Sequence, residues 1–163
     1  MLNPQKKVLI VSDTHGELYN FDTAYKRTKP DLVLHLGDVE WQEEEIRSMC
    51  SCPVKIVKGN CDYGHSLATD DMFDLGLHRV WMTHGDKYNV KYDTDFIIRM
   101  AKERGCDVVL FGHTHVPEET IKDGIIALNP GSLTFPRQAE RVPTYIVLDV
   151  DKKGNFTYKF ETL

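Results

Sequence analysis

Apolar and polar residues alternate along the chain in a way that predicts short buried strands separated by amphipathic helices. The run from Lys7 to Ser12 is apolar and β-branched, as in a strand buried on both faces. Similar runs lie at 31–36 and 53–58, with helical spacing of apolar residues between them. The elements predicted here are strand 7–12, helix 20–28, strand 31–36, helix 41–49 and strand 53–58. The chain therefore begins in a βαβαβ order.

The rest of the chain predicts more strands than one doubly wound sheet needs. Residues 93–104 form the clearest helical pattern, and Gly105 is expected to end it. Asp123-Gly124 is a hairpin turn signal. The remaining predicted strands are 72–75, 78–83, 107–111, 118–122, 125–128, 145–150 and 156–160. We expect an α/β fold of two packed sheets with helices outside, in a single domain over residues 1–163.

Metal-binding residue types gather where the predicted strands end. In open α/β sheets, ligands bind outside the carboxyl ends of the strands. Five strand ends carry, in chain order, Asp13 and His15, then Asp38, then Asn60, then His84, and last His113 and His115. Glycine accompanies most of these residues and allows the backbone to turn sharply and approach closely. The sequence thus predicts that carboxylate, amide and imidazole groups meet at one edge.

This mixture of ligands indicates a catalytic metal centre. Carboxylate oxygen, amide oxygen and imidazole nitrogen suit Mn, Fe or Zn. Cysteine is nearly absent from the set, which argues against a structural zinc site. Seven ligands exceed the needs of one ion but fit two ions that share a carboxylate, roughly 3.5–4 Å apart, as in phosphoester hydrolysis. Each motif alone has an ordinary interpretation as a turn or a structural histidine, and their joint occurrence at strand ends favours the metal centre.

The ordered motifs resemble those of calcineurin-like metallophosphoesterases. They are Asp13-x-His15, Gly37-Asp38, Gly59-Asn60-Cys61-Asp62, His84-Gly85-Asp86 and Gly112-His113-Thr114-His115. The short chain and the Gly-Asn-Cys-Asp variant resemble the small bacterial and archaeal phosphodiesterase branch, to which the vacuolar sorting subunit 29 of retromer is structurally related. Asn129-Pro130-Gly131-Ser132 also resembles this branch.

The resemblance implies a four-layer αββα sandwich and a ligand assignment. Asp13, His15 and His115 would hold one ion. Asn60, His84 and His113 would hold the other, and Asp38 would bridge the two. The cofactors would be two divalent ions, with Mn²⁺ expected and Ni²⁺, Fe, Zn²⁺ or Mg²⁺ as alternatives. The implied reaction is in-line attack on phosphorus by a metal-bridging hydroxide in a phosphodiester.

Cys61 marks a departure from the larger relatives, many of which have histidine after Gly-Asn. That histidine can protonate the leaving oxygen, whereas a thiol is a weaker hydrogen-bonding group. We therefore expect a preference for esters with good leaving groups, such as aryl phosphodiesters. Asp62 or a water molecule could supply the missing proton. The alternative interpretation of Cys61 is a small packed residue.

Several other polar residues could support the site, and each has a structural interpretation beside the functional one. His35 lies inside a buried strand and is interpreted as a hydrogen-bonded core histidine. Asp86 could orient His84 or an adjacent turn, or act only as a cap. Trp41 could line the pocket or start a helix. The remaining residues are His65 and Arg137, left open as loop or substrate-facing residues, and His78, predicted on a hairpin surface.

Composition and charge limit the classes of partner that the protein is expected to bind. The net charge is −5 and both signs are mixed along the chain, so nucleic acid is disfavoured as a partner. No stretch approaches the ~20 apolar residues of a membrane helix, and the polar start does not resemble a signal peptide. We expect reduced thiols at Cys50, Cys52, Cys61 and Cys106 and a cytoplasmic location.

Two other functions stay open at this point. The same fold could serve as a non-catalytic, metal-binding scaffold for protein partners, as the resemblance to the retromer subunit suggests. A nuclease would share the phosphodiester chemistry, but an aromatic and basic groove is not apparent from the sequence. The expected substrate is a small phosphodiester, and association into a homo-oligomer is compatible with the resemblance.

Overall fold

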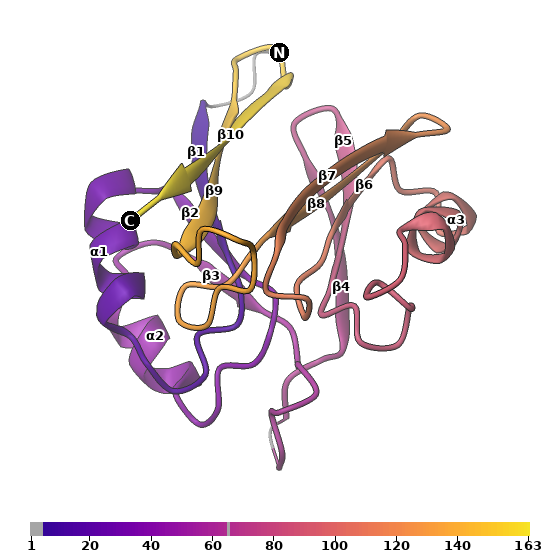
Figure 1. Ribbon diagram of the computed structural model, residues 1–163. Coiled ribbons are helices and arrows are strands. Elements are labelled where there is room, and N and C mark those ends of the chain that lie inside the picture. Colours follow the sequence, from indigo (N-terminus) through magenta and orange to yellow (C-terminus); the bar gives the residue numbers. More distant parts are fainter. Residues whose placement is uncertain (1–4, 65) are drawn as a thin grey trace.

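Two five-stranded sheets pack face to face, and helices cover their outer faces (Figure 1). The computed structural model describes residues 5–64 and 66–163. Helices α1 (Tyr19–Thr28) and α2 (Glu43–Met49) lie on the outside of one sheet, and α3 (Asp95–Glu103) lies on the outside of the other. The predicted αββα sandwich is confirmed.

The first sheet has the strand order β10-β9-β1-β2-β3. Its strands are β1 (Lys6–Val11), β2 (Leu32–His35), β3 (Val54–Ile56), β9 (Thr144–Val150) and β10 (Phe156–Thr162). Strands β1, β2 and β3 are parallel, whereas β9 pairs antiparallel with both β1 and β10. The carboxyl ends of the three parallel strands therefore meet at one edge.

The second sheet has the order β4-β5-β6-β8-β7. Its strands are β4 (Asp70–Leu75), β5 (His78–Thr83), β6 (Val108–Leu110), β7 (Pro117–Lys122) and β8 (Ile125–Pro130). Strands β5, β6 and β8 are parallel, and the hairpin partners β4 and β7 form the edges. The predicted Asp123-Gly124 turn joins β7 to β8, with positive φ at both residues.

Alternating side chains of the central strands build three apolar layers. Val8 and Ile10 point between the sheets, where they share a cluster with Val80 and Leu110 of the second sheet. Their neighbours on β1 point outward toward α1 and α2, while the cluster under α3 contains Trp81, Ile97 and Phe111. This alternation explains why these strands read as continuous apolar runs, because both faces are buried.

Most predicted boundaries agree with the structure to within a few residues, and two details differ. Helix α2 begins at Glu43 rather than at Trp41, because Glu40 and Trp41 adopt positive φ angles of 46° and 74°, which a helix cannot include. His78 lies on the β4–β5 hairpin as predicted, but it is half-buried rather than fully exposed. Its ring lies 4.1 Å from that of Phe156, centroid to centroid, and its Nδ1 is 2.7 Å from Asp107.

Two further features of the described residues bear on the sequence expectations. The four cysteines are free thiols. None of the helices in residues 5–64 and 66–163 is long and apolar enough to span a membrane.

Candidate metal centre

The carboxyl ends of the parallel strands bring the predicted ligands together. Backbone hydrogen bonds tie the loops after β1 and β2: Asp13 N–H donates to Gly37 O (3.1 Å) and His15 N–H donates to Asp38 O (2.9 Å). The two sheets are joined here as well, because His113 N–H donates to Asp13 Oδ2 (3.1 Å). Main-chain geometry therefore sets the position of each ligand relative to the others.

Asp13, His15 and His115 form one potential metal-binding group. Asp13 is fully buried, and its Oδ1 lies 3.2 Å from His115 Nε2 and 3.6 Å from His15 Nε2. The two imidazole Nε2 atoms lie 3.1 Å apart. Three ligand atoms thus converge on one point from loops about 100 residues apart in sequence.

Asn60, His84 and His113 form a second group beside the first. Asn60 Oδ1 lies 2.9 Å from His84 Nε2 and 3.0 Å from His113 Nδ1. The two imidazole rings are 5.2 Å apart, centroid to centroid, and nearly perpendicular. One amide oxygen and two imidazole nitrogens are a donor set suited to a divalent transition metal.

Two carboxylates lie between these groups. Asp38 is 2 % exposed, and its Oδ2 is 3.2 Å from His84 Nε2 and 3.5 Å from His15 Nε2. Asp13 Oδ1 also reaches toward both sides, since it lies 3.8 Å from His84 Nε2. Asp38 thus lies between the two groups, and Asp13 contacts both as well.

Hydrogen bonds at Nδ1 set the orientation of three of the histidines. Leu36 O lies 2.7 Å from His84 Nδ1, and Phe135 O lies 2.7 Å from His115 Nδ1. Both carbonyls accept the Nδ1–H, so each neutral imidazole directs its Nε2 lone pair into the site. Glu40 Oε2 does the same for His15 at 3.1 Å. Such contacts fix the tautomer and raise the basicity of a ligating imidazole.

The backbone at the site is strained. Asp13, His15, Asp38, His113 and His115 all have φ between 47° and 71°, a region that costs energy for residues other than glycine. Such conformations persist where the surroundings hold them and where function uses them. Five of the seven predicted ligands share this feature, and they account for nearly half of the eleven such residues in the described chain.

Two glycines let the loops approach one another. A Cβ on Gly37 would lie 2.7 Å from Gly59 N and 2.8 Å from His84 Nδ1, and a Cβ on Gly59 would overlap Asp38. The glycines next to the predicted ligands therefore serve close approach.

The cluster pulls the pKa values of its acids and bases in opposite directions. Burial would raise the pKa of Asp13, but the neighbouring imidazoles of His115, His15 and His84 outweigh it and hold that pKa well below its usual range. The pKa of Asp38 is lowered in the same way, against its own burial, chiefly by His84. Burial would lower the pKa of His84, but Asp38 and Asp13 raise it to about 9. The two carboxylates therefore stay negatively charged and attract cations.

The residues fit a bound metal ion on a further observation. Asp13 Oδ1 is buried and accepts no hydrogen bond, although three imidazole Nε2 atoms lie within 3.8 Å of it. An unsatisfied buried carboxylate oxygen is costly. A cation among these atoms would satisfy it, and the N/O donor set matches Mn, Fe or Zn.

Metal binding is expected to release a proton from His84. With a pKa of about 9, metal-free His84 is protonated at pH 7.5, whereas a coordinating imidazole must be neutral. Apparent affinity should therefore rise as the pH increases toward 9, with about one proton released per binding event. Titration calorimetry with Mn²⁺ in buffers of different ionisation enthalpy measures this release. His84→Asn should reduce it, and a binding enthalpy that does not depend on the buffer would contradict the expectation.

Both oxygens of the Asp62 carboxylate accept hydrogen bonds from backbone N–H groups of two loops. Asp62 is 1 % exposed; its Oδ2 accepts N–H groups from Asp38 and Gly59, and its Oδ1 accepts that of Glu40, each at 2.8 Å. These contacts hold the Asp38 loop against the Asn60 loop. These hydrogen bonds explain why a carboxylate is present at this position without requiring the proton-donor function considered from the sequence.

Cys61 is partly exposed beside the site. Its N–H donates to Asp38 Oδ1 at 2.8 Å, so its backbone orients the central carboxylate. Burial, followed by the charges of Asp38 and Glu40, raises the pKa of the Cys61 thiol to about 11. The side chain is thus a neutral thiol near neutral pH. Glu40, close to both Cys61 and His15, was missed in the sequence, although it lies only two residues after Asp38.

Two histidine-related expectations have different outcomes. His35 is buried as expected: Gly37 N–H donates to its Nδ1 (3.2 Å), and its Nε2 lies 3.0 Å from Thr14 Oγ1. Burial lowers its pKa to about 4, so it stays neutral. Asp86, left open as a residue that could orient His84 or an adjacent turn or act as a cap, does not contact His84, whose Nδ1 is held by the Leu36 carbonyl. Asp86 is exposed, and the described residues offer it neither a hydrogen bond nor an ion pair.

The segment Asn129–Ser132 forms hydrogen bonds to the loops that carry the metal ligands. Ser132 Oγ donates to Asp13 O (2.8 Å), and Asn129 Nδ2 donates to Gly112 O (3.0 Å). It therefore joins the loops after β1 and β6. Arg137 donates its backbone N–H to His115 O, and its side chain is exposed. His65 lies outside the described residues.

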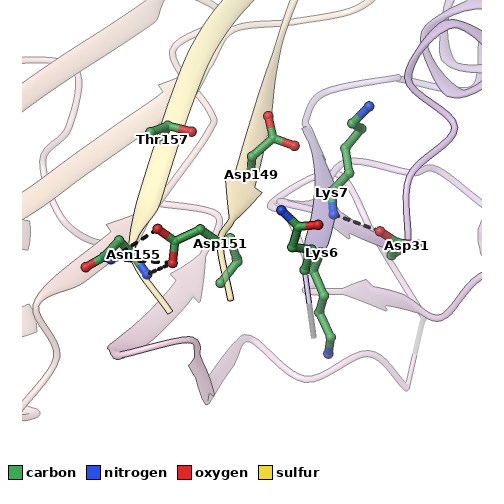
Figure 2. A pocket seen from close by; sticks show the side chains of 9 residues that line it. Lys6, Lys7, Asp31, Asp149, Asp151, Asn155 and Thr157 are labelled. Atoms are coloured by element: carbon green, nitrogen blue, oxygen red, sulfur yellow. Dashed lines mark hydrogen bonds between the residues drawn. The ribbon is translucent and has the colours of Figure 1, made fainter. Parts of the chain in front are cut away.

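A separate hollow lies at the opposite end of the first sheet (Figure 2). It has a volume of about 430 Å³ and is lined by Lys6 and Lys7 at the start of β1 and by the β9–β10 turn. Its carboxylates are used locally: Asp31 accepts the Lys7 N–H, and Asp151 accepts bonds from Asn155. Nothing there resembles the convergent donors of the strand-end site.

Comparison with known proteins agrees with this geometry. Residues 7–153 match the Calcineurin-like phosphoesterase superfamily domain. The chain is 34% identical to the probable metallophosphoesterase YsnB of Bacillus subtilis over 146 residues, covering 88% of this chain and 84% of YsnB. A predicted phosphoesterase from Streptococcus pneumoniae has the same fold, with a TM-score of 0.82, 27% identity, and coverage of 98% of this chain and 91% of that one.

Two structures below 25% identity share the fold alone. An archaeal phosphodiesterase superposes with a TM-score of 0.74 at 24% identity, covering 96% of this chain and 99% of its own. Vacuolar protein sorting 29 of Cryptosporidium parvum superposes with a TM-score of 0.78 at 20% identity, covering 99% of both chains. Family match, relatives and strand-end site agree, and the chain belongs to the calcineurin-like phosphoesterase superfamily.

Proposed function

We propose that this protein is a binuclear metal-dependent phosphodiesterase. The observation that carries the proposal is the convergence of Asp13, His15 and His115 beside Asn60, His84 and His113, with Asp38 between them. Two adjacent N/O donor groups that share a carboxylate are the arrangement of two-metal phosphoester hydrolases. The superposition on the archaeal phosphodiesterase supports the choice of a diester.

The protein side chains would bind and orient, while the metals would supply the charge. Bound divalent ions, for which Mn²⁺ is our first choice, act as Lewis acids and lower the pKa of water. Asp13 and Asp38 would hold the ions, and the hydrogen bonds at His15, His84 and His115 would keep each Nε2 aimed at them. His113 and Asn60 are the more exposed ligands and would face the substrate phosphate.

Hydrolysis of bis-p-nitrophenyl phosphate tests the proposal. Metal-stripped protein is expected to show no turnover, and added Mn²⁺ should restore it. His113→Ala removes one ligand of the second group and should lower the rate by about a hundredfold or more, since a positioned charge-stabilising group contributes that much. Turnover that persists after metal removal, or that survives His113→Ala at full rate, would overturn the proposal.

Cys61→His is expected to help most with poor leaving groups. The Cys61 thiol has a pKa raised to about 11 and is a weak acid for protonating a leaving oxygen, whereas an imidazole transfers protons near neutral pH. Proton transfer by a positioned group contributes roughly 10²–10⁴-fold. We expect a gain of about tenfold or more for dialkyl diesters, which lose an alkoxide, and little gain for diesters that lose p-nitrophenolate. Equal change across a leaving-group series would contradict this prediction.

The alternative is a metal-binding scaffold without turnover. It is favoured by the shared fold of vacuolar protein sorting 29. Protein that binds Mn²⁺ tightly but hydrolyses no phosphoester would establish it. The complete ligand set of the strand-end site supports catalysis instead.

A further inference from the structure

Most exposed aromatic side chains of the described residues lie in the loops after the parallel strands, on the edge that carries the metal centre. Large aromatic residues are usually buried, and a group of exposed ones marks a binding surface. Five of the six exposed aromatic residues among the described part of the chain follow the carboxyl ends of parallel strands. They are Tyr19, Trp41, Tyr63, Tyr92 and Phe135, and the sixth, Phe160, lies on the edge strand β10.

Phe135 and Trp41 lie on the side of the site formed by His15. The Phe135 ring lies 5.6 Å from the His15 ring, centroid to centroid, and the Phe135 carbonyl holds His115. Trp41 follows Glu40, which contacts His15, and its indole is 72 % exposed. The Trp41 ring lies beside the next loop, since a Cβ on Gly64 would be 3.3 Å from it.

Tyr63 lies with Asn60 of the second metal-binding group, whereas Phe135 lies beside His15 of the first. Tyr63 and Asn60 line a cavity of about 270 Å³ that opens beside the second metal-binding group. The Tyr63 ring is 73 % exposed. A phosphate bound at the metals would therefore have an aromatic ring available beside each metal-binding group, and aromatic rings stack on bases.

The same cavity carries cations on its wall. Lys58 and Lys87 line it, and neither has an ion-pair partner among the described residues. Asp86 and the buried Asp62 also line it, but the Asp62 oxygens are occupied by three N–H groups. These lysines suit a sugar phosphate next to the metals. The net charge of −5 provides no long basic track, which limits the ligand to a short one.

We infer that the substrate is a nucleotide phosphodiester of about dinucleotide length, with bases stacked on the aromatic side chains on both sides of the scissile phosphate. This inference rests on the proposed phosphodiesterase function. Water adds to phosphorus, the bond from phosphorus to one ester oxygen breaks, and that oxygen takes the proton. The products are a nucleoside monophosphate and a nucleoside.

Binding of AMP and ribose 5-phosphate isolates the contribution of the base. The two ligands carry the same phosphate and sugar, and only AMP has an aromatic ring. Calorimetry with the Mn²⁺-loaded protein should give about tenfold tighter binding for AMP, the size expected for base stacking. Tyr63→Leu, Trp41→Leu and Phe135→Leu should reduce that ratio, whereas the matched control Phe160→Leu should keep it.

Further outcomes separate this inference from the proposed function. Equal binding of AMP and ribose 5-phosphate would overturn the inference, even in protein that hydrolyses bis-p-nitrophenyl phosphate. AMP selectivity without any diester hydrolysis would overturn the phosphodiesterase proposal. Hydrolysis of a dinucleoside monophosphate at least as fast as of a decanucleotide supports a short substrate. A strong preference for the decanucleotide that falls steeply with salt would overturn the proposed length.

Discussion

Asp38→Asn is expected to reduce Mn²⁺-dependent diester hydrolysis on the order of a thousandfold. A bound metal contributes several kcal/mol of charge stabilisation in the transition state, and each ~1.4 kcal/mol is a factor of ten. Asp38 Oδ2 lies within 3.5 Å of both His84 Nε2 and His15 Nε2, so its loss affects both metal-binding groups. Asparagine preserves the size of the side chain while removing its charge. Steady-state rates over a range of Mn²⁺ concentrations measure the effect.

Metal content then shows which carboxylate is shared. Loss of a bridging ligand should reduce the occupancy of both ions, whereas loss of a terminal ligand should reduce that of one. We expect the former for Asp38→Asn and the latter for Asp13→Asn, measured by elemental analysis after dialysis. Asp149→Asn, at the hollow at the other end of the first sheet, is the matched control. Full activity and normal metal content in Asp38→Asn would remove Asp38 from the ligand set.

The sheet architecture was largely predictable, because burial leaves a direct signature. Residues 8–11 of β1 and all of β6 are covered on both faces, so these stretches are continuous apolar runs. The ligands sit immediately after such runs, at turns rich in glycine. Strand β3 was harder to delimit, since it spans only Val54–Ile56 at the edge of its sheet.

The orientation of the ligands could not be predicted from residue types. His84 and His115 are held by the backbone carbonyls of Leu36 and Phe135, and every residue has such a carbonyl. Only the fold decides which carbonyl lies within reach. Asp86 was a reasonable candidate from its spacing, but that spacing places it in solvent. The positive φ at Asp38 and His113 likewise has no marker, because aspartate and histidine are not obligatory there.

The exposed aromatic residues near the site could not be recognised as a group from the sequence. Trp41, Tyr63 and Phe135 lie far apart in the sequence and form no groove pattern there, which is one reason why a nuclease was disfavoured. Parallel strands deliver their following loops to one edge, so residues that look isolated become neighbours. The net charge of the chain likewise does not reveal that Lys58 and Lys87 line the same cavity as Asn60.

Asp62→Ala is expected to lower the free energy of unfolding by about 2–4 kcal/mol, with a fall in Tm of roughly 5–15 °C. The carboxylate accepts three backbone N–H groups, and each buried donor left unsatisfied costs about 1–3 kcal/mol. A protein of this size changes Tm by about 2–4 °C per kcal/mol. Thermal unfolding of the metal-free protein measures the loss. Asp86→Ala, on the same cavity wall, should stay within about 0.5 kcal/mol.

Kinetics of Asp62→Ala distinguish support of the loops from proton donation. If Asp62 holds the Asp38 and Asn60 loops in register, its loss should weaken Mn²⁺ binding by about 10–100-fold, as for other residues that orient ligands. Saturating Mn²⁺ should then recover much of the rate, and the dependence on leaving-group pKa should match that of the unaltered protein. A proton donor predicts the reverse: unchanged metal affinity and a rate loss that grows as the leaving group becomes poorer. The contacts of Asp62, which lie entirely with backbone N–H groups, favour the first result.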